Sequence, residues 1–98
     1  MPKYLVLWEV DATRAPIDAK ERGAMWSMMV DQVKQDLKEG REEDWGCFVG
    51  ETRGYAIDER SEVELAEDLQ RFYPFLRFEV HQVMSIDEIA EVAKSLTE

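Results

Sequence analysis

The residues with the clearest chemical potential are a histidine and a carboxylate two positions before it. His81 is the single histidine of this 98-residue chain, and Glu79 precedes it within Phe75–Met84 (FLRFEVHQVM), which alternates as a β-strand. Residues i and i+2 of a strand point to the same face, so Glu79 could orient His81 as a general base. A histidine on a surface or an interface is the commoner arrangement, and we favour it over catalysis.

Three further side chains could line a ligand site. Arg77 could hold a carboxylate, although pairing with Glu79 or Glu9 across strands is the commoner use of such an arginine. Tyr55 and Trp8 could stack on a flat aromatic ligand, or they could pack in the interface between two sheets. We favour packing.

The sequence lacks the patterns that hold metals, nucleotides or activated nucleophiles. Cys47 is the only cysteine, so an internal disulfide and a thiolate metal cluster are excluded, and we expect its side chain to be a small buried hydrophobic group. The charge run Glu42-Glu43-Asp44 is interpreted as solvated rather than as a set of cation ligands. No phosphate-binding loop, nucleophile elbow or paired-carboxylate motif is present. We predict no metal and no cofactor.

The charge balance restricts the partners. The chain has 22 acidic against 12 basic residues and a formal net charge of −10, which opposes binding to nucleic acid phosphates and anionic lipids. Arg53–Ile57 (RGYAI) follows the first half of an RNA-recognition strand signature, but the residues after it break the signature. No segment approaches the about 18 apolar residues of a membrane span, and no signal peptide is apparent. We expect an acidic cytoplasmic protein that binds neither nucleic acid nor membrane.

Periodicity and helix-capping residues predict the elements that position these side chains. Strands are expected at Tyr4–Val10, Trp45–Val49, Tyr55–Glu59 and Phe75–Met84. Helices are expected from Asp18 to Gly40, from Ser61 to Pro74, and after Ser85. The order β-α-β-β-α-β plus a terminal helix predicts a single α+β domain over residues 1–98. Its plan is the split βαβ, ferredoxin-like one, with the antiparallel strands in the spatial order fourth, first, third, second.

Two helices cover one face of such a sheet and leave the other face open. We expect Leu5 and Leu7 beneath the helices. The open face would then carry Tyr4, Val6, Trp8, Val10, Tyr55 and Ile57, edged by Arg77, Glu79 and His81. An apolar patch of this size is rarely exposed on a monomer, and its burial offsets the entropy of association. We therefore predict a homodimer in which two sheets face each other, with Tyr4, Trp8, Tyr55, Ile57 and Arg77 on the dimer or ligand-binding face.

The chain resembles the dimeric α/β-barrel superfamily over nearly its whole length. The resemblance rests on the order of the elements, on Arg53–Ile57 (RGYAI), and on Leu76–Val80 (LRFEV) followed by a terminal helix. The likeness is strongest to small uncharacterised members. Muconolactone isomerases, YciI-like proteins and antibiotic-biosynthesis monooxygenases are more distant. The resemblance implies a dimer with a pocket between sheet and helices or inside the barrel, and it does not imply one chemistry.

We expect a binding or assembly role without catalysis. The alternative is a cofactor-independent isomerase or monooxygenase that acts on a small hydrophobic substrate. His81 would then be the general base, Tyr55 and Trp8 the pocket walls, and Arg77 an anion anchor. An enzyme needs a pocket that excludes water yet admits substrate, whereas a structural interface is filled by Trp8 and Tyr55 themselves.

Overall fold

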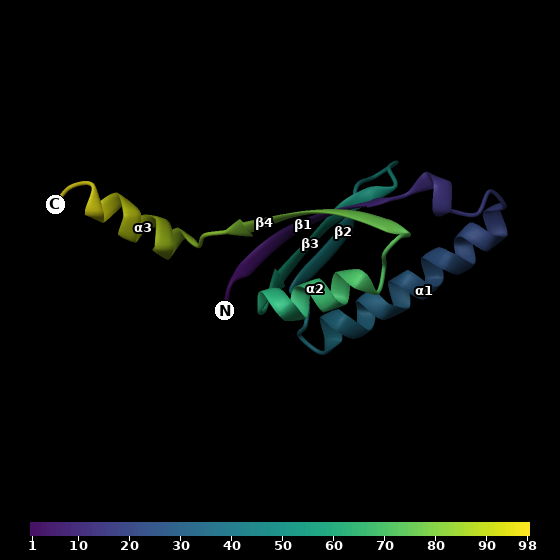
Figure 1. Cartoon of the computed structure of the whole chain (residues 1–98), viewed down its shortest axis with the longest axis horizontal. Coiled ribbons are helices and arrows are strands. Elements are labelled where there is room, and N and C mark those ends of the chain that lie inside the picture. The colour runs from purple at the N-terminus through teal and green to yellow at the C-terminus, as the bar shows by residue number, and fades with distance from the viewer.

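Four antiparallel strands form one sheet, and two helices lie on one of its faces (Figure 1). The computed structural model describes all residues, Met1–Glu98. The strands are β1 (Lys3–Val10), β2 (Asp44–Cys47), β3 (Arg53–Glu59) and β4 (Leu76–Val83), in the order β2-β3-β1-β4. The helices are the short 3-10 helix η1 (Ala12–Arg14), α1 (Ala19–Lys38), α2 (Glu62–Gln70) and α3 (Ile86–Ser95). The predicted ferredoxin-like α+β fold and its strand order are confirmed.

Side-chain caps start the three α-helices where the sequence predicts them. Asp18 accepts a hydrogen bond from the Glu21 backbone N–H at 3.1 Å, which caps α1. Ser61 caps α2 in the same way. Ser85 and Glu88 form a complete capping box at the start of α3, with each side chain accepting from the other residue's backbone N–H.

The row of β1 that faces the helices is the opposite of the predicted one. Tyr4, Val6, Trp8 and Val10 are buried beneath α1 and α2, and Leu5 and Leu7 lie on the open face. Both rows of β1 are apolar, so alternation alone could not choose between them. The large side chains face the helices because they fill the layer between sheet and helices. Trp8 stacks on Trp45 with ring centroids 5.0 Å apart.

The rest of the sheet follows the predicted faces. Ala56 is buried under the helices opposite Val6, whereas Tyr55 and Ile57 lie on the open face opposite Leu7 and Leu5. In β4, Leu76 and Phe78 pack into the core. The pairing of β4 with β1 therefore places Arg77, Glu79, His81 and Val83 on the open face.

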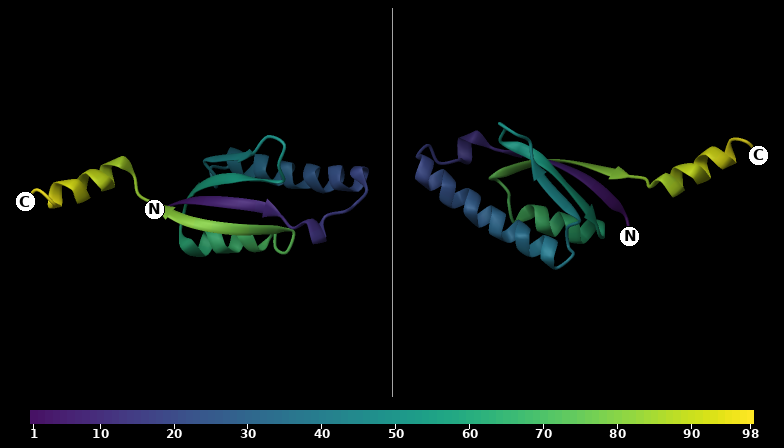
Figure 2. Two further views of the ribbon diagram at one scale, coloured as in Figure 1. Left: turned by 90° about the horizontal axis from the view of Figure 1, so that it is seen from above. Right: turned by 180° about the vertical axis from the view of Figure 1, so that it is seen from behind.

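The terminal helix stands apart from the domain. α3 continues from the end of β4 away from the sheet and from α1 and α2 (Figures 1 and 2). The molecule is therefore elongated, with extents of 61 × 26 × 21 Å and a radius of gyration of 16.3 Å. A compact chain of similar length has a radius of gyration of about 13 Å. α3 consequently covers no part of the open face.

Alanine substitutions at two glycines, one crowded in the core and one in open space, should have opposite effects on stability. A Cβ on buried Gly54 would lie 2.6 Å from Cζ2 of Trp8 and would also collide with the backbone of β2, which cannot move away. Gly54→Ala should therefore destabilise the protein by about 1–3 kcal/mol. Gly23 in α1 has open space around it, so Gly23→Ala should stabilise by about 0.5–1 kcal/mol. Urea unfolding measures both changes. A Gly54→Ala protein as stable as wild type would contradict the packing of Trp8.

Candidate functional site

The open face of the sheet has an apolar centre. Leu5 and Leu7 of β1 lie opposite Ile57 and Tyr55 of β3, and all four side chains are only half-buried. Phe48, after β2, extends the centre by stacking on Tyr55 with ring centroids 6.4 Å apart. The Tyr55 hydroxyl donates to Asp44 Oδ2 at 2.8 Å, which fixes the ring across the face.

Charged residues of both signs surround this centre. Lys3 and Glu9 lie at the two ends of the β1 row, opposite Glu59 and Arg53 of β3. Arg77 of β4 faces Glu9 from the other side. The rim therefore carries three strong bases, Lys3, Arg53 and Arg77, and four acids, Glu9, Asp44, Glu59 and Glu79. The face thus has only one more acid than strong bases, whereas the whole chain has a net charge of −10.

The predicted histidine–carboxylate pair forms on this face. His81 Nε2 and Glu79 Oε2 are 3.1 Å apart, and the two side chains are 52% and 66% exposed. Arg77 lies on the same face of β4. Tyr55, Ile57, Arg77, Glu79 and His81 are thus brought to one surface. Tyr4 and Trp8, which were predicted there, lie on the other side of the sheet in the core.

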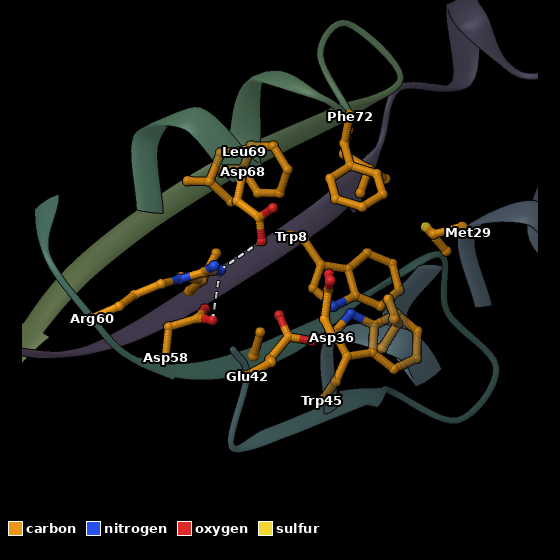
Figure 3. A pocket seen from close by; sticks show the side chains of 15 residues that line it. Trp8, Met29, Asp36, Glu42, Trp45, Asp58, Arg60, Asp68, Leu69 and Phe72 are labelled. Carbon is orange, nitrogen blue, oxygen red and sulfur yellow. Dashed lines mark hydrogen bonds and ion pairs between the residues drawn. The ribbon is translucent and has the colours of Figure 1, made fainter. Parts of the chain in front are cut away.

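A second candidate site lies inside the domain, between the sheet and the helices (Figure 3). Five ionisable side chains are buried there: Asp36, Glu42, Asp58, Arg60 and Asp68. They come from the last turn of α1, the loop before β2, the end of β3 with the residue that follows it, and the last turn of α2. Burying charges in so small a protein costs stability unless each charge has a partner of opposite charge or a hydrogen bond.

Three of the four buried carboxylates are paired with arginines. Arg60 Nη2 donates to Asp58 Oδ1 at 2.8 Å and to Asp68 Oδ2 at 2.7 Å. Asp36 Oδ1 accepts from Arg41 Nη2 at 2.6 Å and from Gln32 Nε2 at 3.0 Å. Asp68 also pairs with the more exposed Arg71. These contacts satisfy Asp36, Asp58 and Asp68 but leave Arg60 Nε without a partner.

Glu42 is the exception. Glu42 is only 9% exposed, and its Oε1 has no hydrogen-bond partner. The backbone holds it there, because the Asp36 carbonyl accepts from the N–H groups of Arg41 and Glu42, and Gly40 supplies the positive φ that ends α1. Burial, followed by the charges of Asp58 and Asp36, raises the pKa of Glu42 to about 8. Burial likewise raises the pKa of Asp58 to about 6.

A small cavity of about 30 Å³ lies beside these groups. Its apolar wall includes Trp8, Met29, Trp45, Phe72 and Phe78, and Glu42, Asp36 and Asp58 lie on its polar side (Figure 3). A volume of this size accepts a water-sized group. No group of three or more His, Cys, Asp or Glu side chains has an arrangement that could hold a metal ion.

Sequence reasoning missed this interior site. The run Glu42-Glu43-Asp44 was expected to be solvated, and for Glu42 this is wrong because the turn after α1 directs its side chain inward. A usable signal was present in β3. Ala56 was placed under the helices, and Asp58 lies two residues further along the same strand, so it must face the helices too.

The prediction for Cys47 is also wrong. Cys47 is exposed rather than buried. β2 is a four-residue strand at the edge of the sheet, and Cys47 is its last residue. Its Sγ lies 3.5 Å from the Glu51 carbonyl oxygen in the turn that follows. Because β2 is an edge strand, no further strand lies beside it to cover its last residue.

Comparison with known proteins supplies no identity. No protein-family model matches the chain, and no curated protein matches it. None of its helices combines the length and the apolar composition that crossing a lipid bilayer requires.

The interior carboxyl should make stability depend on pH. The folded-state pKa of Glu42 is raised, so the folded protein holds a proton that the unfolded chain releases, and stability falls as pH rises toward and through about 8. Glu42→Gln removes this loss. Above about pH 8 the variant should be about 2–4 kcal/mol more stable than wild type, with little difference near pH 5.

Urea unfolding at a series of pH values measures this difference. Glu43→Gln is the matched control, because the Glu43 carboxylate is exposed and forms only a 3.5 Å pair with Lys3. The control should follow the wild-type curve within about 0.5 kcal/mol. Parallel curves for wild type and Glu42→Gln would contradict the burial of an unpartnered Glu42.

Proposed function

We propose that this protein works as a homodimer of the dimeric α/β-barrel type, with a binding or assembly role. A second copy would cover both the open face of the sheet and helix α3. The observation that carries the proposal is the exposed apolar stripe of α3, a helix that stands apart from the sheet and from α1 and α2 (Figures 1 and 2). Membership of the superfamily and a cytoplasmic location are part of the same proposal and rest on the sequence.

The stripe of α3 has the spacing of a helix interface. Ile86, Ile89, Val92 and Leu96 are 81%, 47%, 46% and 82% exposed. Steps of three and four residues put them on one side of the helix. An isolated helix of 10 residues is marginal in water, even with the capping box of Ser85 and Glu88. α3 therefore needs a surface against which it can pack.

A second copy of this chain is the partner that the open face fits. The face has an apolar centre and a rim with three bases and four acids, so it carries charges of both signs in nearly equal number on a strongly acidic protein. In a two-fold symmetric contact each rim base can meet a rim acid of the other copy. A basic partner would gain more from the acidic remainder of the surface than from this face.

The same symmetry offers α3 a docking surface. An apolar groove of about 540 Å³ lies between α1 and the start of β4, lined by Val10, Met25, Met28, Met29, Phe72 and Phe75. α3 follows the end of β4, whereas the groove borders its start. If the two-fold axis that relates the copies is perpendicular to the strands, the two β4 strands run antiparallel. The end of β4 in one copy then lies near the start of β4 in the other, which brings α3 of each copy beside the groove of its partner. Methionine-rich grooves accept apolar helix faces readily.

The enzymatic alternative keeps one specific support, the 3.1 Å pairing of His81 with Glu79. Both side chains are more than half exposed in a single chain. Water would be excluded from them only where a second copy covers the face, so an active site of this kind also requires the dimer.

Charges on the stripe of α3 test the proposal. Ile89→Asp combined with Val92→Asp places two carboxylates where apolar contact is needed, so dimerisation should weaken by at least about 100-fold. Glu91→Gln changes the opposite side of α3 and should leave the dimer intact. Native mass spectrometry at micromolar concentration measures the subunit count. A monomeric wild-type protein would contradict the proposal, and so would a double variant that dimerises as wild type does.

A further inference from the structure

We propose that the interior cavity is a binding site for an ammonium group, with Glu42 as its counter-ion and the rings of Trp8 and Trp45 as its wall. The ligand class is the free ammonium ion or the terminal ammonium of a small primary amine. This site lies on the opposite side of the sheet from the open face and is independent of the proposed dimer.

The first support is the unsatisfied carboxylate. Asp36, Asp58 and Asp68 have arginine partners, and Glu42 has none (Figure 3). A buried ionised carboxylate without a partner is strongly destabilising, and a cation with N–H donors satisfies both its charge and its lone pairs. Four carboxylates are buried in this interior with one buried guanidinium, that of Arg60, while Arg41 and Arg71 pair with Asp36 and Asp68 from the more exposed side. The interior therefore accepts a further positive charge and repels an anion.

The second support is the shape and chemistry of the cavity. Its volume of about 30 Å³ suits a group the size of water, and an ammonium ion has that size. Aromatic rings favour a cation at their faces, and Trp8, Trp45, Phe72 and Phe78 all belong to the lining. A bare metal ion would need several converging oxygen ligands, and no such group of side chains is present.

The third support is the position of Glu42 in the chain. It sits in the short connection between α1 and β2, directly after Arg41, which is 39% exposed. Glu42, Arg60 and Phe72 are the lining residues that belong to no helix or strand. A ligand can enter by local movement of the connection that carries Glu42, without opening the sheet.

Thermal unfolding of the whole protein tests the site. Four chloride salts are compared at equal ionic strength near pH 8, where Glu42 is partly ionised: ammonium, methylammonium, tetramethylammonium and sodium. The midpoint should rise with ammonium above its value with sodium. A rise with methylammonium as well identifies a terminal amine as the ligand, and a rise with ammonium alone identifies the free ion. Tetramethylammonium has no N–H donor and is too large, so it should match sodium.

Variants assign the effect to Glu42. Glu42→Gln should weaken ammonium binding by at least about tenfold, and Glu43→Gln should bind as wild type does. Binding should also strengthen by at least about tenfold between about pH 6 and pH 8, because the Glu42 proton must leave. Equal midpoints in ammonium and sodium would overturn the proposal and leave water as the occupant. An ammonium effect that survives in Glu42→Gln would overturn it too. The salt comparison uses wild-type protein, so it decides even where a variant does not fold.

Discussion

The structure depends on which side of β1 faces the helices. Trp8 decides this, because it stacks on Trp45, meets the edge of Trp26 with ring centroids 6.0 Å apart, and donates its indole N–H to the Tyr55 carbonyl oxygen at 3.2 Å. If β1 turned its other face to the helices, the space that the Trp8 ring fills between the sheet and the helices would be left empty. With Trp8 and Tyr4 inside, Leu5 and Leu7 must face outward, since successive residues of a strand point to opposite faces.

Two surfaces follow from that choice. On the helix side, the aromatic layer encloses a cavity that the buried carboxylates border, and Glu42 closes it from the turn after α1. On the other side, the sheet keeps a modest apolar centre with a ring of charges of both signs. A small domain buries little surface by itself, and this one also keeps its terminal helix outside the core. In the proposed dimer, a second copy would supply the missing burial.

The elements and the faces of β3 and β4 were predictable from the sequence, but the face of β1 was not. The caps at Asp18, Ser61 and Ser85 and the alternation of β3 and β4 are local signals, and local signals fix helix starts and strand phases. β1 is apolar on both rows, so its orientation depends on the volume that the helices leave to be filled. The burial of Glu42 was not predicted for a similar reason. A glutamate in an acidic run reads as solvated, and only the three-dimensional path of the turn after Gly40 places it inside.

Amide hydrogen exchange of α3 at two protein concentrations tests the central claim most directly. An isolated 10-residue helix opens freely, so its amides have almost no protection as a monomer. In the proposed dimer, amides of Ile89–Ala93 should be strongly protected at high concentration and should lose protection on dilution. Exchange of α3 at unprotected rates at every concentration would contradict the account, because the helix would then have no partner surface.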